Sequence, residues 1–132
     1  MPQSFTPFLT FQGGVAEAAM NFYCTVFPGS RIVRITRYAA GMPGPEGTVM
    51  TAEFTLGEQR FLAADSPIRH QWDFTPGISI FVDCKSAEEL DAAFAALAED
   101  GRVYMPIDNY GFSQRFGWVG DKFGVNWQLN LA

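Results

Sequence analysis

Hydrophobic positions along the first half of the chain switch between a two-residue and a helical period. Residues 5–11 form an apolar run that is typical of a strand, and residues 14–27 carry apolar side chains at helical spacing. These helical positions are Val15, Ala18, Ala19, Phe22 and Val26. A Pro-Gly pair then ends the predicted helix. Three strand-like runs follow, at residues 30–39, 47–56 and 58–65.

The second half of the chain repeats this order. Residues 77–84 form a strand-like run, and Ser86 with Glu89 three positions later is a capping-box pattern that predicts the start of a helix. The apolar stripe of this helix consists of Leu90, Ala93, Phe94 and Leu97. Three short strands are expected near residues 102–106, 113–120 and 125–131. The pattern therefore predicts the order βαβββ twice, which is an α+β fold with one helix per module.

The two modules are expected to form one domain over residues 1–132. The first module covers residues 1–65, the second covers residues 77–132, and residues 66–76 connect them. This connector contains two prolines and several polar residues. Half a chain of about 65 residues offers only a small core by itself, which favours a shared core over two independent domains.

Composition narrows the possible partners. The hydrophobic fraction of 48% is typical of a folded globular protein. The chain has 9 basic and 14 acidic residues, a net charge of −5, which disfavours nucleic acid and anionic membranes as partners. No secretory signal or membrane-length apolar run is present, so we expect a cytoplasmic protein. In that compartment Cys24 and Cys84 are expected to be small buried thiols rather than a disulfide.

Two ionisable residues are candidates for catalysis. Strand alternation places Glu53 with Thr51 and Thr55 on the face opposite Met50, Ala52 and Phe54. If that face lines a cleft, Glu53 is a candidate acid, base or cation anchor and Thr51 a candidate substrate contact; if it faces water, Glu53 serves solubility. The single histidine, His70, lies in the connector. It is a candidate general base or pH switch, and the alternative is a solvent-facing or capping residue.

Aromatic side chains are candidates for ligand contacts. Trp72 lies in the connector, Tyr110 in a loop, and Trp118 and Trp127 in the closing strands. Such rings stack on flat ligands or hold a cation over a ring face, although core packing is the alternative for each of them.

Three segments of the chain resemble a known superfamily. They are PFLTFQGGVAEAAMNFYCTVFPGSRI, TVMTAEFTLGEQRFLAAD and FGWVGDKFGVNWQL. Together with the doubled βαβββ order they are similar to the vicinal oxygen chelate superfamily of glyoxalases, bleomycin resistance proteins and dioxygenases. The closest likeness is to its PhnB-like branch, which is often labelled as the 3-demethylubiquinone-9 3-methyltransferase domain. The resemblance implies two modules with mixed sheets curved around a shared cleft, and a homodimer.

The resemblance also implies where a metal would bind. Metal-dependent members hold a divalent ion with His and Glu side chains on the first and last strands of each module. The corresponding positions here are Phe8 (or Pro7), Ala63 or a neighbour, a residue near Gly77, and Gln128. None supplies a carboxylate or an imidazole, so we expect no metal and no other cofactor. Gln128 is expected to contact substrate as a neutral amide.

Two classes of function follow from these residues. The first is a metal-independent protein that binds a small molecule, similar to the drug-binding members of the superfamily. The alternative is an enzyme of the isomerase, lyase or dioxygenase type, or the labelled methyltransferase, that acts on a small oxygenated metabolite through Glu53 and His70. Methyl transfer is disfavoured because enzymes that use S-adenosylmethionine usually need a doubly wound sheet with a Gly-rich turn, which FQGG only partly matches.

Overall fold

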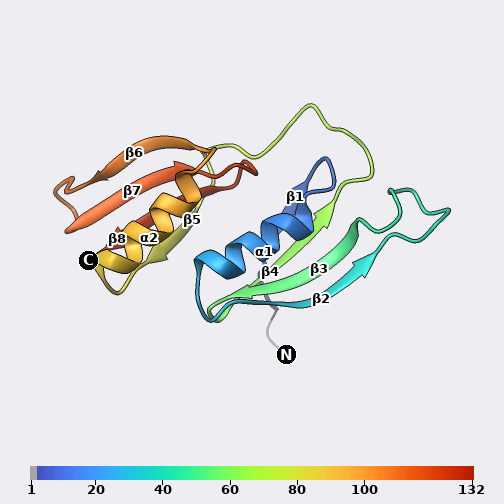
Figure 1. The fold of residues 1–132 in the computed structure, drawn as a ribbon, viewed down its shortest axis with the longest axis horizontal. Coiled ribbons are helices and arrows are strands. Elements are labelled where there is room, and N and C mark those ends of the chain that lie inside the picture. Colours follow the sequence, from blue (N-terminus) through green and yellow to red (C-terminus); the bar gives the residue numbers. More distant parts are fainter. Residues whose placement is uncertain (1–2) are drawn as a thin grey trace. The chain divides into compact units, whose positions relative to one another are not determined.

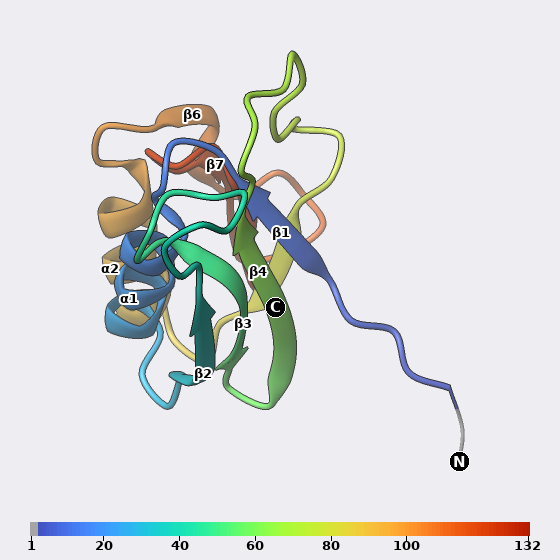
Figure 2. The same cartoon turned by 90° about the vertical axis from the view of Figure 1, so that its right-hand side faces the viewer.

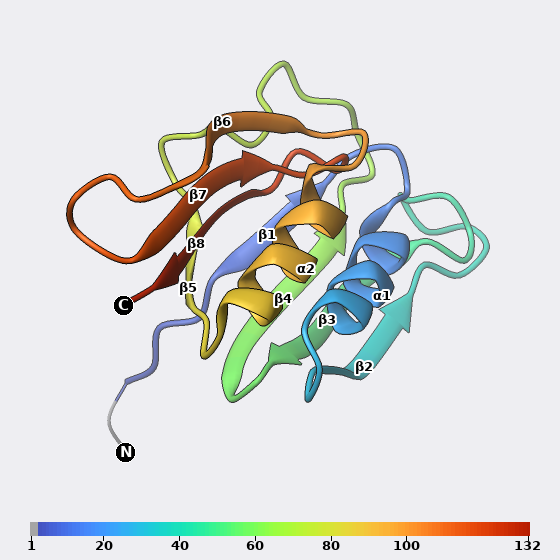
Figure 3. The ribbon, with the colours of Figure 1, turned by 60° about the vertical axis from the view of Figure 1, so that its left-hand side comes forward.

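The computed structural model describes residues 3–132 and divides the chain into two compact units (Figure 1). The first unit ends at Gln71 and the second covers Trp72–Ala132. The boundary lies inside the predicted connector. Each unit has one helix and one four-stranded sheet, and the helix covers one face of the sheet (Figures 1 and 3). The predicted α+β class with one helix per module is therefore confirmed.

The first unit follows the order that the hydrophobic pattern predicts. Its elements are β1 (Phe8–Phe11), α1 (Ala16–Val26), β2 (Arg31–Arg37), β3 (Val49–Leu56) and β4 (Gln59–Asp65). The strands lie in the order β1-β4-β3-β2, as Figure 2 shows, with β1 parallel to β4 and the other pairs antiparallel. The last strand of the unit is therefore central, and the first strand is an edge.

The second unit repeats this arrangement. Its elements are β5 (Ile80–Asp83), α2 (Ala87–Ala98), β6 (Arg102–Asp108), β7 (Arg115–Gly120) and β8 (Asn126–Leu131). The strand order is β5-β8-β7-β6, and β5 is parallel to β8. Both modules therefore share one topology, as the doubled pattern predicted.

The two helices differ in how well their buried faces were predicted. In α2 the predicted stripe of Leu90, Ala93, Phe94 and Leu97 is buried, and the Ser86 side chain accepts a hydrogen bond from the Glu89 backbone at 3.1 Å. In α1 the predicted stripe is only partly correct, because Ala19 is buried but Ala18 is exposed. The buried residues are Ala16, Ala19, Met20 and Tyr23. The long side chains of Met20 and Tyr23 decide which way this helix faces, since they bury more apolar area than the small residues beside them.

A buried carboxylate fastens the start of α1 to the sheet. The helix has no side-chain cap of its own at Val15. Asp65, at the end of β4, accepts a hydrogen bond from the Ala16 backbone at 2.9 Å through Oδ1 and from the Val49 backbone at 2.9 Å through Oδ2. One side chain thus satisfies an open N–H at the helix start and joins it to β3 and β4.

A second buried carboxylate shapes the hairpin between β7 and β8. Asp121 accepts backbone hydrogen bonds from Phe123 at 2.8 Å and Val125 at 3.1 Å, and its other oxygen accepts from the Trp127 indole at 2.9 Å. Gly124 takes a left-handed conformation with φ of 93° in the same turn. The DKFG…W pattern that carries much of the sequence resemblance is therefore a structural hairpin lock.

Neither cysteine is in a disulfide. Burial raises the pKa of the Cys84 thiol to about 11, with a further contribution from the nearby Glu89 carboxylate. Burial also raises the pKa of Cys24. Both thiols therefore stay protonated near neutral pH. Cys84 is buried, as expected, whereas Cys24 is only partly buried. Among the described residues, no helix has the length and apolarity needed to cross a membrane.

Replacing Asp121 with alanine is expected to destabilise the protein by about 2–4 kcal/mol, because three buried N–H donors lose their acceptor. Urea unfolding followed by circular dichroism measures the loss. Lys122→Ala, at the exposed neighbouring position, is the control and should change the free energy of unfolding by less than about 0.5 kcal/mol. Equal effects of the two substitutions would contradict the hairpin-lock role.

Candidate functional site

The sheet face that the helix leaves uncovered is the candidate site in each unit. We call it the helix-free face. In the first unit the residues that alternate toward α1, such as Ala52, Phe54 and Ala63, are buried. On the opposite face Phe8 leaves 52% of its surface exposed. An exposed aromatic ring on a sheet face is a typical feature of a contact surface.

Cross-strand pairing places Glu53 in one row with Phe8, a position implied for a metal ligand. Phe8 pairs with Leu62, Leu62 with Glu53, and Glu53 with Arg34. Thr51 and Thr55 are partly exposed on the same face, which agrees with the alternation predicted for β3. The sequence thus correctly assigned Glu53 and Thr51 to the face away from the helix.

Glu53 is held by two arginines. Its carboxylate lies 3.0 Å from Arg60 Nε and 3.7 Å from Arg34 Nε, with 20% of the side chain exposed. Each carboxylate oxygen therefore has a guanidinium group as its partner. This geometry suits an ion-pair network on the sheet better than a free base.

The helix-free face of the second unit has an equivalent row with different chemistry. Phe81 pairs with Gln128, Gln128 with Trp118, and Trp118 with Met105. Gln128 donates a hydrogen bond from Nε2 to Ser79 Oγ at 2.8 Å. This row is uncharged, and it combines an amide, a hydroxyl and aromatic surface.

Aromatic rings gather at one end of this face. Phe116 is the centre, with ring centroids at 5.0 Å from Phe112, 6.1 Å from Tyr110 and 6.5 Å from Phe81. We call these four residues the aromatic cluster. Phe81 leaves 54% of its surface exposed and Phe112 leaves 64%. Sequence reasoning singled out Tyr110 but missed the phenylalanines, because core packing is the usual role of a Phe such as Phe81 or Phe116 and Phe112 lies in a loop.

The positions implied for metal ligands are now placed by the strand registers. Ala63 points toward α1 and is fully buried, so its neighbour Leu62 occupies the helix-free face beside Phe8. In the second unit Ser79, rather than Gly77, meets Gln128. Within residues 3–132, no group of three or more His, Cys, Asp or Glu side chains is close enough to share a metal ion.

Trp127 is corrected from a ligand contact to a core residue. It pairs with Ile80 and Val119 on the helix side of the sheet and is fully buried. Its indole donates to Asp121. Trp118 directly precedes Val119 on β7, and its side chain lies on the opposite, helix-free face because neighbouring side chains on a strand alternate. Trp72, 55% exposed, lies outside the strands at the start of the second unit.

His70 belongs to the loop after β4. Its Nε2 lies 2.7 Å from Ser66 Oγ, and its backbone donates to Gln12 Oε1 at 2.6 Å. These contacts tie the loop to the end of β1. They fit the capping role that the sequence left open for His70, and they also place a hydroxyl against an imidazole. Ser66 carried no signal in the sequence, because a lone serine matches no nucleophile motif.

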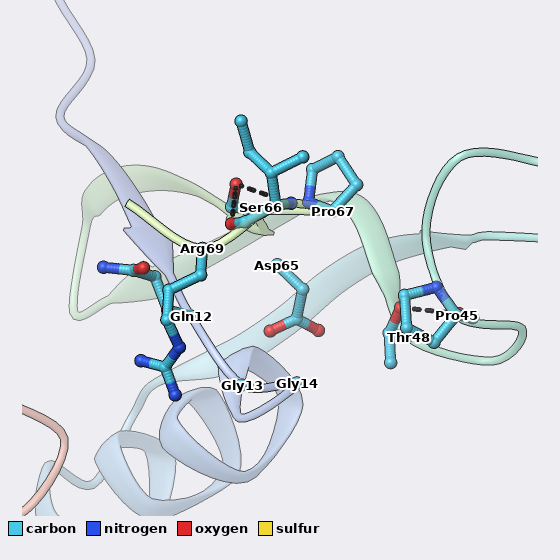
Figure 4. Close-up of a pocket in the computed structure, with 10 residues that line it drawn as sticks. Gln12, Gly13, Gly14, Pro45, Thr48, Asp65, Ser66, Pro67 and Arg69 are labelled. Atoms are coloured by element: carbon cyan, nitrogen blue, oxygen red, sulfur yellow. Dashed lines mark hydrogen bonds between the residues drawn. The ribbon is translucent and has the colours of Figure 1, made fainter. Parts of the chain in front are cut away.

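A cavity of about 480 Å³ lies at the start of α1 in the first unit (Figure 4). Figure 4 shows Gln12 and Arg69 on one side, Pro45 and Thr48 on the other, and Asp65 between them. Both Asp65 oxygens already accept backbone hydrogen bonds, so this carboxylate serves the fold. In the sequence this cavity is marked by the FQGG turn, which only partly matches the Gly-rich turn of enzymes that use S-adenosylmethionine.

Comparison with known proteins places these units in a family. The family model described as 3-demethylubiquinone-9 3-methyltransferase matches residues 3–130. A crystal structure of a PhnB protein from Bacillus cereus is 50% identical, with a TM-score of 0.94, and the match covers 98% of this chain and 100% of that one. Protein YjdN of Escherichia coli is 24% identical over 100% of this chain and 96% of its own length.

The fold extends to more distant proteins. A glyoxylase/bleomycin resistance protein/dioxygenase domain from Frankia is 13% identical with a TM-score of 0.70, over 100% of this chain and 93% of that one, and so shares the fold. The chain therefore belongs to the 3-demethylubiquinone-9 3-methyltransferase family and is similar to PhnB proteins.

Proposed function

We propose that the protein binds a small organic molecule on its helix-free sheet faces and needs no metal ion to do so. The observation that carries this proposal is the uncharged row of Phe81, Gln128 and Trp118, flanked by the exposed rings of the aromatic cluster. Ligand sites in proteins combine apolar and aromatic surface with a few fixed polar groups, and this row has that composition.

The donor set supports independence from metal. The positions implied for His and Glu carry Phe8 and either Ala63 or its neighbour Leu62 in the first unit. In the second unit they carry Gln128 and its register partner Phe81, with Ser79 beside Gln128. A hydroxyl and an amide are weak neutral ligands, and Gln128 already donates to Ser79.

We further propose that the protein is a cytoplasmic homodimer without nucleic acid or membrane partners. The exposed aromatic residues of both helix-free faces support a partner surface, the two free thiols fit a reducing compartment, and the net charge of −5 disfavours phosphate-rich partners.

An enzyme acting on an oxygenated metabolite is the second candidate. It is favoured by a carboxylate on the helix-free face, Glu53, and by the hydroxyl–imidazole contact of Ser66 with His70. Methyl transfer with S-adenosylmethionine is not proposed. That cofactor is usually bound by a doubly wound parallel sheet, whereas β1 and β4 are the only parallel pair among the described strands of the first unit.

Native mass spectrometry of protein purified without chelator or metal-affinity resin tests the binding proposal directly. The expected spectrum shows a dimer without a stoichiometric divalent ion and with an organic adduct whose mass identifies the ligand. A spectrum with one divalent ion per chain, lost on Gln128→Ala, would overturn metal independence.

Truncation of Phe81 tests where the ligand binds. Phe81→Ala is expected to weaken binding of the neutral probe N-phenyl-1-naphthylamine roughly tenfold, because a buried aromatic contact is lost. Fluorescence titration measures this change. Phe5→Ala removes a ring that is 81% exposed outside the sheets and serves as the control. If both variants bind like the parent chain, the helix-free face of the second unit is not the site.

Glu53→Gln separates the two candidate functions. An enzyme that uses this carboxylate would lose turnover of the metabolite found by mass spectrometry, while the fold and the affinity for that metabolite remain. The binding function predicts no product with either chain. Product formation is followed by proton NMR, with Glu58→Gln, in the turn between β3 and β4, as the matched control. Full turnover by Glu53→Gln would remove Glu53 from any mechanism.

A further inference from the structure

Three arginines gather on the helix-free face of the first unit, although the chain as a whole is acidic. On β2, Arg34 is the register partner of Glu53, and Arg31 is that of Thr55. Arg60, on β4, is the other register partner of Thr55. Register partners point to the same face of a sheet, so all three guanidinium groups lie on the face that carries Glu53. We call Arg31, Arg34 and Arg60 the arginine cluster.

A register shift in β2 brings two of these arginines to one face. Three positions separate Arg31 from Arg34, and side chains three positions apart point to opposite faces of a regular strand. The pairing with β3 shifts between Ile32 and Arg34, so that Val33 is left without a register partner. An extra residue of this kind re-aims the side chains that follow it, and Arg34 therefore shares the face of Arg31.

Glu53 balances only part of this positive charge. Its carboxylate lies 3.0 Å from Arg60 Nε and 3.7 Å from Arg34 Nε. Within residues 3–132 these two arginines have no other ion pair, and Arg31 has none. One carboxylate thus serves three guanidinium groups, in a chain whose net charge is −5. The face therefore attracts anions although the whole chain repels them.

The guanidinium groups are accessible to a ligand. The side chains of Arg34 and Arg60 are 48% and 44% exposed. Each guanidinium group has about five N–H donors. Among the described residues, the only hydrogen bond that the three groups donate runs from Arg60 Nη1 to Thr6 Oγ1, at 2.9 Å. Most donors therefore remain for an anion, and the planar guanidinium fork matches the two oxygens of a carboxylate.

Apolar surface lies next to the arginine cluster. Leu62 is the register partner of Glu53, and Phe8 is the partner of Leu62 on the edge strand β1. The Phe8 ring is the exposed ring described above, with 52% of the residue surface accessible. Neighbouring strands are about 4.8 Å apart, so Phe8 lies about 10 Å from Glu53 across the sheet. A planar molecule of this length reaches from the arginines to the Phe8 ring.

We propose that the helix-free face of the first unit binds an aromatic carboxylate. Arg34 and Arg60 hold the carboxylate group through charge-assisted hydrogen bonds. The aromatic part lies on Leu62 and Phe8, and Arg31 adds attraction at longer range. This inference rests on the proposed small-molecule binding and assigns the ligand class of one face, whereas the uncharged row of the second unit suits a neutral molecule.

Two probes of the same shape test this proposal on the full chain. The probe 2-naphthoate is an anion, and 2-naphthamide is its neutral counterpart. Isothermal titration calorimetry measures both affinities. The affinity for 2-naphthoate is expected to fall at least about fivefold when sodium chloride is raised from about 0.02 to about 0.5 M, because salt screens exposed charges. The affinity for 2-naphthamide should not fall.

Matched variants test the charged contact. Arg34→Gln should weaken 2-naphthoate binding about five- to tenfold, and it should leave 2-naphthamide binding unchanged. Arg37→Gln is the control, because it removes the same charge from the same strand. Arg37 pairs with Glu17 on α1 at 2.6 Å, away from the helix-free face. This control should change the affinity for 2-naphthoate by less than about twofold.

Two phenylalanine variants locate the aromatic part of the probe. Phe8→Ala should weaken 2-naphthoate binding roughly fivefold, because the ring loses its contact, whereas Phe81→Ala should not. Circular dichroism shows that each variant is folded. The salt dependence is measured on the parent chain and does not depend on any variant.

The outcomes separate this inference from the proposed function. If neither salt nor Arg34→Gln weakens 2-naphthoate binding, or if Arg37→Gln weakens it equally, the inference is overturned. Loss of 2-naphthoate binding in Phe81→Ala instead of Phe8→Ala also overturns it, and supports the site proposed in the second unit. If 2-naphthoate does not bind the parent chain, the inference fails, whereas titration with N-phenyl-1-naphthylamine decides the proposed function independently.

Discussion

One helix covers only one face of a four-stranded sheet, and the rest of this protein follows from that constraint. In each unit the alternation of side chains sends one set of residues into the core and the other to a face that its own helix cannot reach. Phe8 and Phe81, at equivalent positions of β1 and β5, are both more than half exposed for this reason. The same constraint makes the uncovered face available for a ligand.

Two buried carboxylates hold the fold together through hydrogen bonds to backbone and side-chain N–H groups. Asp65 holds the start of α1, and Asp121 locks the hairpin that leads into β8. Asp121 also fixes Trp127, so the most distinctive part of the sequence defines the core of the second unit. The residues that mark the family thus serve the fold. A match to the family description therefore does not by itself assign a reaction to this chain.

The two helix-free faces differ in chemistry although their topology is the same. In the first unit the row next to Phe8 contains Glu53 and its two arginine partners. In the second unit the equivalent row contains Gln128 and Trp118, with no ion pair along the row. The two modules thus share one strand topology but carry different side chains on their helix-free faces. The uncharged face is the better place for a neutral planar molecule because no charge there needs a counter-ion.

The amino-acid sequence by itself determined the order of elements, the doubled module, the cap and stripe of α2, and the side of β3 on which Glu53 lies. These features depend on local periodicity, which neighbouring residues reveal. The stripe of α1 was partly misassigned because eight of the eleven residues of AEAAMNFYCTV are apolar, so that docking onto the sheet selects the face. Only the tertiary structure separated Trp118 from Trp127, joined Asp121 to the Trp127 indole, and placed Arg31, Arg34 and Arg60 on the face of Glu53. Those contacts depend on strand register and on a register shift in β2, and neither property is visible in residue types alone.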